Sequence, residues 1–319
     1  MLNSHEIEQS YKRIQPYIRQ TPVVELETGA FGSQANLNLK IESLQHTGSF
    51  KSRGAFNRLL KTPPSSAGVV AASGGNHGIA VAYAAKELGL SAEIFVPSIS
   101  SPVKQARIRT LGATIHIVGN TYADALIASE NHAKATGSLN VRAYHHPDII
   151  AGQGTVGIEW ELQTPKLDTL LVSVGGGGLI AGICAWYGSR VKIIAVEPEQ
   201  ACALHTSRAA GKLTDVEIGG IAADSLGARC ISELAFELTQ AYLYDSVVVC
   251  DRSIRESQRL LWSNLCIAAE PGGATALAAL VSGAYQPQSG ERVGVLICGG
   301  NVDLGTLAGV VSENFGITS

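Results

Sequence analysis

The sequence predicts an α/β protein of two lobes, each built on a mostly parallel, twisted sheet covered by helices. Short β-branched runs such as 68–73, 92–97 and 168–174 alternate with alanine-rich stretches whose apolar residues recur at helical spacing. These runs are apolar almost throughout, as is typical of parallel strands buried on both faces. Glycine-rich stretches follow three of the strands, at the edge where such sheets bind ligands.

The order of the elements divides the chain into two series. The first series has predicted strands at 68–73, 92–97 and 113–118, with helices at 76–89 and 101–112. The second has predicted strands at 168–174, 191–197, 245–250 and 292–298, again with helices between them. We expect the strand-like run 36–43, and the first 50 residues with it, to join the second lobe. This gives a large domain of residues 1–50 and 149–319, a small domain of residues 51–148, and an active site between them.

Composition excludes several classes of function. The 319 residues carry a net charge of −3 and no cluster of Lys and Arg, so neither nucleic acid nor a membrane surface is an expected partner. The longest uncharged stretch, 169–189, is interrupted by four glycines, and the N-terminus lacks the apolar run of a secretory signal. Six cysteines without a CxxC pair suggest reduced thiols and a cytoplasmic location.

The stretch "VSVGGGGLIAG" follows one strand and opens a helix. Glycines let backbone N–H groups approach an anion, and the helix N-terminus adds its positive end, so a phosphate site is favoured over a plain turn. Gly176, Gly178 and Ala181 also match a dinucleotide fingerprint, with Glu197 where a ribose-binding acid would lie. An NAD-dependent oxidoreductase is therefore a rival hypothesis.

Four other stretches carry candidate side chains. "ASGGNHGIA" places Ser73 and Asn76 at a strand-to-helix junction, where turn amides can hold a carboxylate or Asn76 can lie near the helix N-cap. "YHHPDII" is interpreted as a turn before a helix that starts near Ala151, because adjacent histidines point apart and make a poor metal site. Cys298 closes the last strand, and Lys51 in "GSFKSRGA" is either a surface lysine or a nucleophile held in a pocket.

Taken together and in order, the motifs resemble a known family. The pieces "SFK", "SGGNHG", "AGQGTVGIEWE", "SVGGGG", "VEPE" and "CGGNVD" resemble the fold-type II pyridoxal-phosphate enzymes, whose fold is tryptophan synthase β-like. Within them the chain is most similar to the serine/threonine dehydratase (threonine ammonia-lyase) and serine racemase group. The resemblance covers roughly residues 20 to 310.

The resemblance implies a cofactor and a set of roles. Pyridoxal 5'-phosphate would form a Schiff base with Lys51, the catalytic residue, and Phe50 would pack against the cofactor ring. The remaining roles implied are these: Asn76 on the ring hydroxyl, Gly175, Gly176, Gly177 and Gly178 around the phosphate, Cys298 at the pyridine nitrogen, and Ser73, Gly75, Asn76 and His77 around the substrate carboxylate. A homodimer is implied as well.

The variant "SFKSRG" with "SGGNHG" resembles the dehydrating branch, which implies elimination from L-threonine or L-serine to a 2-oxo acid and ammonia. A racemase and a 3-hydroxyaspartate dehydratase are the alternatives within the family. Racemases of this group carry a serine where Gly74 stands, which disfavours racemisation. A neutral thiol at Cys298 would favour elimination too, whereas a thiolate would reverse that expectation.

Some members of this group also bind a divalent cation through a glutamate, a backbone carbonyl and an aspartate. Glu197 and Ala201 match the first two positions, but Ala203 stands in place of the aspartate. A hard cation needs six or more oxygen ligands, so we expect no tightly held metal here.

Overall fold

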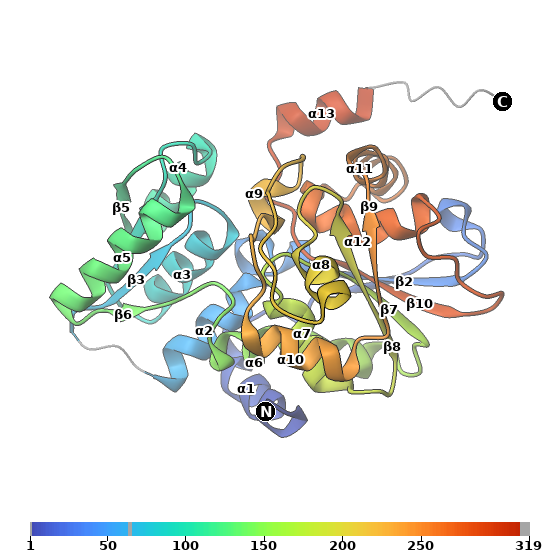
Figure 1. Ribbon diagram of the computed structural model, residues 1–319, viewed down its shortest axis with the longest axis horizontal. Coiled ribbons are helices and arrows are strands. Elements are labelled where there is room, and N and C mark those ends of the chain that lie inside the picture. Colours follow the sequence, from blue (N-terminus) through green and yellow to red (C-terminus); the bar gives the residue numbers. More distant parts are fainter. Residues whose placement is uncertain (1, 63–65, 313–319) are drawn as a thin grey trace.

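Two sheets organise the chain, which this computed structural model describes for residues 2–62 and 66–312 (Figure 1). The larger has the strand order β1-β2-β10-β7-β8-β9 and the smaller β5-β4-β3-β6. The larger sheet comprises β1 (Val23–Glu25), β2 (Asn36–Ile41), β7 (Thr169–Ser173), β8 (Lys192–Pro198), β9 (Asp245–Val249) and β10 (Arg292–Ile297). The smaller comprises β3 (Val69–Ala72), β4 (Ala92–Val96), β5 (Thr114–Ile117) and β6 (Leu139–Asn140).

Helices cover both sheets. They are α1 (Ser4–Ile14), α2 (Lys51–Lys61), α3 (Asn76–Glu87), α4 (Pro102–Thr110), α5 (Tyr122–Thr136), α6 (Pro147–Gln163), α7 (Gly178–Tyr187), α8 (Ala203–Ala210), α9 (Ala223–Leu226), α10 (Glu233–Tyr242), α11 (Asp251–Leu265), α12 (Pro271–Val281) and α13 (Leu304–Ser312). Within the described residues every strand pairing is parallel except that of β1 with β2. The prediction of an α/β fold with mostly parallel sheets is confirmed.

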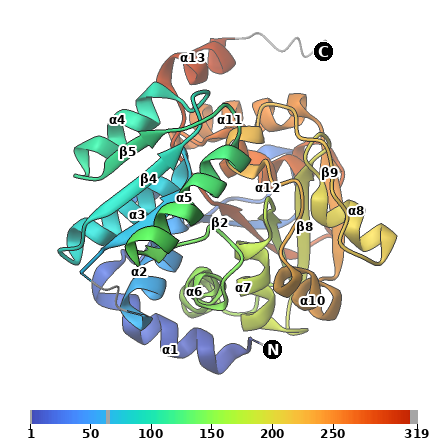
Figure 2. The same cartoon turned by 60° about the vertical axis from the view of Figure 1, so that its left-hand side comes forward.

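The larger sheet is buried on both faces, as its apolar strands predicted. Successive side chains of a strand point to opposite faces, so Leu170 and Val172 pack with α6, α7 and α10, whereas Leu171 packs with α11 and α12. Figure 2 shows these two helix layers on opposite sides of the sheet. The uncharged stretch 169–189 divides into β7, a glycine loop and α7, and no described helix is long and apolar enough to cross a membrane.

The smaller sheet is organised in the same way. Val69 and Ala71 pack with α2, α3 and α4, while Val70 and Ala72 pack with α5. Helix α2 contacts both α3 and α6, so it lies between the two sheets. Strand β2 pairs with β10 and therefore brings part of the first 50 residues into the larger sheet; the domain limits at residues 50 and 148 stay a prediction.

The structure differs from the expected elements in two respects. Strands β1 and β6 span three and two residues, too few to produce a periodic pattern. Helix α6 begins at Pro147, so the expected start near Ala151 is wrong. Proline suits the first helical position because its missing N–H is not needed there, and Nδ1 of His146 accepts the N–H of Asp148 at 3.1 Å, which caps the helix.

Candidate active site

A cavity lies where β7 and β10 end, between the two sheets. These strands are parallel neighbours, so their carboxyl ends lie side by side. Helices α2, α3, α7 and α12 all begin at the cavity wall, and their positive ends favour an anionic ligand. The wall includes Phe50, Lys51, Asn76, Gly175, Gly176, Gly177, Gly178 and Cys298. The structure thus brings together eight of the residues singled out in the sequence.

The glycine loop joins β7 to α7 and has no room for side chains. A Cβ atom on Gly175 would lie 2.9 Å from Cα of Leu226, and one on Gly176 would overlap the ring of Tyr144. Gly177 has a φ of +86°, which favours glycine, and a Cβ there would lie 2.6 Å from Cβ of Ala235. Glycine is therefore required at these positions by packing and by backbone conformation.

The same loop presents unpaired donors. Within residues 2–62 and 66–312, the backbone N–H groups of Gly175 to Gly178 have no protein acceptor, although Val174 immediately before them pairs with Val196. Buried N–H groups left without partners are rare in proteins. Four such donors at the start of a helix can bind a phosphate group. The cavity therefore fits a phosphorylated cofactor.

Lys51 is the first residue of α2, and its side chain lies in the cavity wall. Burial lowers the pKa of its amine to about 8, although the nearby Cys298 and Glu270 oppose this shift. The amine lies 5.1 Å from the centroid of the Phe50 ring. At physiological pH a substantial fraction of the amine is therefore neutral, as a nucleophile requires.

This pKa predicts how cofactor capture depends on pH. The protonated amine cannot attack an aldehyde, so the apoprotein should bind pyridoxal phosphate slowly below pH 8 and faster as the pH rises through about 8. Stopped-flow absorbance from pH 6.5 to 9.5 measures this rate. A flat profile, or a midpoint near the 10.4 of free lysine, would contradict the account of Lys51.

The turn that delivers Lys51 is bound to the end of β10. Thr47 and Gly48 both have left-handed backbone conformations, with φ of +66° and +76°. The carbonyl of Gly48 accepts the N–H of Gly300 at 2.9 Å, and the N–H of Phe50 donates to the carbonyl of Cys298 at 3.3 Å. Lys51 and Cys298 are therefore held in register by backbone hydrogen bonds.

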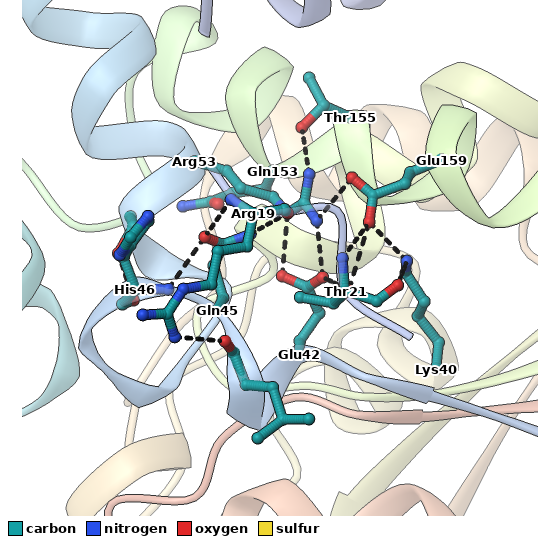
Figure 3. A network of polar contacts seen from close by, with 12 residues as sticks. Arg19, Thr21, Lys40, Glu42, Gln45, His46, Arg53, Gln153, Thr155 and Glu159 are labelled. Atoms are coloured by element: carbon teal, nitrogen blue, oxygen red, sulfur yellow. Dashed lines mark hydrogen bonds and ion pairs between the residues drawn. The ribbon is translucent and has the colours of Figure 1, made fainter. Parts of the chain in front are cut away.

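A fully buried cluster of charged side chains fixes the start of α2 against the larger sheet (Figure 3). Arg53 donates to both oxygens of Glu42, at 2.8 and 2.7 Å, and to Glu159 at 3.0 Å. Lys40 donates to the other oxygen of Glu159 at 2.6 Å, and Thr21 donates through its backbone N–H to the same oxygen at 2.7 Å. The cluster contains two cations and two carboxylates, and it joins α2 to β2 and α6.

Cys298 is buried at the end of β10. Burial, together with the neighbouring Glu270, raises the pKa of its thiol to about 12. The thiol donates to the carbonyl of Gly272 at 3.4 Å. Cys298 is therefore neutral at physiological pH, which removes the thiolate alternative left open by the sequence.

Three predicted substrate-binding residues lie outside this cavity wall. The hydroxyl of Ser73 accepts the N–H of Gly75 at 3.2 Å, and Gly75 is the N-cap of α3. Asn76 is the first helical residue, directly after the N-cap, which agrees with the predicted place near the N-cap. The ring of His77 is buried, and its Nε2 lies 2.7 Å from the carbonyl of Val141. Burial lowers the pKa of His77 to about 4. Their role at the substrate carboxylate stays a prediction.

Among the cavity residues that the sequence did not single out, two have side chains that contact its candidate residues. Tyr144 packs against Gly176 and Gly178, and Glu270 lies beside Asn76. Tyr144 lies in "YHHPDII", whose pattern predicted only a turn before a helix and gave no reason to single out the tyrosine. Glu270 opens "EPGGATALAAL", where a proline after an acid already signals a helix start.

Glu197 serves a structural role in this chain. Its two carboxylate oxygens accept the backbone N–H groups of Leu204 at 2.9 Å and His205 at 2.7 Å, at the start of α8. Burial raises the pKa of Glu197 to about 7. Each oxygen already accepts one backbone N–H, so the carboxylate acts as the cap at the start of α8.

We therefore predict that divalent cations do not stabilise the protein through Glu197. Mg²⁺, Mn²⁺ or Ca²⁺ at micromolar concentration should leave Tm unchanged, because a site with one occupied carboxylate lacks the oxygen ligands that a hard cation needs. Thermal unfolding of the chelator-treated protein tests this. A rise in Tm that Glu197→Gln removes would reveal a cation site.

Comparisons with known proteins agree with this geometry. Residues 14–299 match the family model described as pyridoxal-phosphate dependent enzyme. The chain is 37% identical over 305 residues to phenylserine dehydratase of Ralstonia pickettii, covering 93% of this chain and 92% of that protein. It is 31% identical to L-threonine ammonia-lyase of Thermotoga maritima, covering 98% of this chain and 79% of that protein. The structure of maize serine racemase superposes with a TM-score of 0.89 at 33% identity, covering 96% of each chain.

Proposed function

Because the chain belongs to the family of pyridoxal-phosphate-dependent enzymes, we propose that it is a dehydratase that converts L-threonine, L-serine or both into a 2-oxo acid and ammonia. The observation that carries this proposal is the neutral thiol of Cys298 in one cavity with the amine of Lys51. Relatives named dehydratase, ammonia-lyase and racemase share the fold, so the choice among these reactions rests on the site.

The cavity residues would hold the cofactor as follows. The amine of Lys51 would bind its aldehyde, the N–H groups of Gly175 to Gly178 its phosphate, Asn76 its ring hydroxyl, and Cys298 would face its ring nitrogen. When bound, the cofactor supplies an electron sink for the negative charge that develops at Cα of the amino acid. The cavity at the starts of four helices supplies the positive potential for phosphate and substrate carboxylate.

Lys51 has the chemistry for the proton transfer. With the amino acid bound in the cavity, the neutral amine of Lys51 would take the proton from Cα, as a general base with a pKa of about 8 can do near neutral pH. The Cα–H and Cβ–O bonds break and one water leaves. The unsaturated amine that is released takes up one water and yields the 2-oxo acid and ammonia, so the net reaction loses only ammonia.

Cys298 supports elimination over slower reactions of the same site. A thiol with a pKa of about 12 that already donates to Gly272 would offer a cofactor ring nitrogen no strong acid. An aspartate there would keep that nitrogen protonated and prolong the life of the negative charge at Cα. Prompt loss of the β-hydroxyl is therefore favoured over transamination and racemisation.

Replacing this thiol by a carboxylate provides a test. Cys298→Asp should increase the fraction of turnovers that end in transamination or racemisation relative to 2-oxo acid release, and Cys298→Ser should keep the wild-type ratio. Chromatography of keto acids and chiral amino acids measures these products. Equal product ratios in all three proteins would contradict the role given to Cys298.

A racemase is the less favoured alternative. Gly74, where the racemases that the chain resembles carry a serine, has no proton to give, and the side chain of Ser100 occupies the space beside it: a Cβ on residue 74 would lie 2.5 Å from Cβ of Ser100. A serine side chain would fit there only if Ser100 moved. Racemisation would therefore need a proton from water.

The experiment that tests the proposed function is a substrate panel. L-Threonine, L-serine, 3-phenylserine and 3-hydroxyaspartate are compared by kcat/KM for 2-oxo acid formation. We expect threonine and serine to lead and to differ modestly, because one methyl group is worth only about 1–3 kcal/mol in a pocket. Preference for 3-phenylserine or 3-hydroxyaspartate would move the proposal to that substrate, and no 2-oxo acid from any of them would overturn it.

A further inference from the structure

Glu270 is a buried acid in the cavity wall that the proposed reaction does not use. It is the N-cap residue of α12, yet its carboxylate makes no hydrogen bond to the amides of that helix. The side chain is 4% exposed and lies in the cavity wall. A contact other than helix capping therefore fixes the conformation of the Glu270 side chain.

Its partner is the side chain of Asn76, which comes from the other sheet. Nδ2 of Asn76 donates to Oε1 of Glu270, and Oδ1 of Asn76 accepts from Nδ2 of Asn301 at 2.8 Å. Both ends of the Asn76 amide are therefore fixed by residues of the larger lobe. Gly299 makes room for this contact, because a Cβ there would overlap Oε1 of Glu270.

The second oxygen of Glu270 has no hydrogen-bond partner within residues 2–62 and 66–312. The nearest cation is the amine of Lys104, 3.8 Å away, which forms its closer ion pair with Asp224. Burial raises the pKa of Glu270, against the opposing influence of Lys104 and Lys51. The other charged groups that face it are Arg107 and Asp224, with the neutral thiol of Cys298.

The ionisation state of Glu270 does not alter its contact with Asn76. A carboxylate accepts the amide hydrogen through Oε1, and a carboxylic acid protonated on Oε2 still accepts it there. Glutamine retains the same acceptor at the same distance from the backbone. Aspartate and alanine do not reach Asn76.

We propose that Glu270 is a positioning residue that orients the amide of Asn76 toward the cofactor ring, and that it does so through its hydrogen bond and not through its charge. The proposal rests on the proposed contact between Asn76 and the ring hydroxyl. It assigns to the start of α12 a part in cofactor binding, because the N-cap residue of this helix fixes a side chain of the opposite lobe at the cavity.

The test compares cofactor affinity across variants by absorbance titration of the apoproteins. Glu270→Ala and Glu270→Asp should each raise the Kd for pyridoxal phosphate by about tenfold, the loss expected for one hydrogen bond. Glu270→Gln should stay within about threefold of the wild type and keep its absorbance maximum. In an Asn76→Ala background, Glu270→Ala should change Kd by less than about twofold, because the two residues act as one unit.

Glu291 provides the matched control. It is also a buried acid of the larger lobe, it accepts hydrogen bonds from Thr169 at 2.5 Å and Tyr285 at 2.6 Å, and it lies outside the cavity wall. Glu291→Ala should lower Tm and leave the Kd for the cofactor unchanged. If it raises Kd as much as Glu270→Ala does, loss of any buried acid explains the effect and the inference fails.

The remaining outcomes separate this inference from the proposed function. A Glu270→Gln variant as weak as Glu270→Ala would show that charge matters, and equal effects of Glu270→Ala with and without Asn76 would show independent roles. Either result overturns the inference alone. An Asn76→Ala variant with wild-type Kd would instead overturn the proposed contact of Asn76 with the ring, on which the inference depends.

Discussion

Replacing Lys51 with alanine is expected to abolish turnover while leaving the fold intact. Lys51 would both hold the cofactor covalently and carry the Cα proton, so 2-oxo acid formation should fall by about 10⁴-fold or more. The visible absorbance of the bound cofactor should be lost with it. At pH 7 the variant should melt no lower than the wild-type apoprotein, because a buried ammonium with a pKa of about 8 is itself destabilising below that pH.

The control for this variant lies on the same helix. Lys61→Ala removes a half-exposed lysine that pairs with Asp148 at 2.7 Å and is not part of the cavity wall. It should keep both the activity and the absorbance of the wild type. Residual turnover in Lys51→Ala above one hundredth of wild type would remove Lys51 from the centre of the mechanism.

Glu159→Gln is expected to have the largest effect on stability. Glu159 accepts from Lys40, from Arg53 and from the backbone of Thr21, all buried. Without its charge, Glu42 alone would balance two buried cations, and breaking a buried pair in this way costs about 3–5 kcal/mol of the free energy of unfolding. Urea unfolding followed by circular dichroism measures the change.

Glu161, two residues further along α6, is the matched control. It pairs with Arg190 at 2.7 Å on the surface, where the Arg190 side chain is 53% exposed. Glu161→Gln should therefore cost less than about 1 kcal/mol. Equal losses for the two variants would mean that the buried cluster contributes no more than a surface ion pair.

Much of the fold could be predicted because its signals are local. The strands at 69–72, 92–96 and 169–173 are apolar runs flanked by helical periodicity, and each lies within a residue or two of its predicted limits. The glycine loop was recognisable because four consecutive glycines have few explanations other than close backbone approach to a ligand. The residues next to Lys51 in the sequence left its role open. Its role as the cofactor lysine was predicted only from the other motifs, which are spread along the whole chain.

The rest depends on contacts between distant residues, which no local pattern records. Lys40 and Glu159 are 119 residues apart in sequence, so a buried ion pair between them has no sequence signature. Asn76 and Glu270 are separated by 194 residues. The direction of a side chain cannot be predicted from the sequence either. His77 lies next to a predicted ligand loop, but its ring contacts the carbonyl of Val141.

The most direct test of the central claim is to incubate the purified holoenzyme with L-threonine and measure 2-oxo acid, ammonia and the configuration of the remaining amino acid. The account predicts equal amounts of 2-oxo acid and ammonia, with the unreacted threonine unchanged at Cα, and the same pattern with L-serine. Accumulation of the Cα-inverted amino acid without 2-oxo acid would contradict it and identify the protein as a racemase.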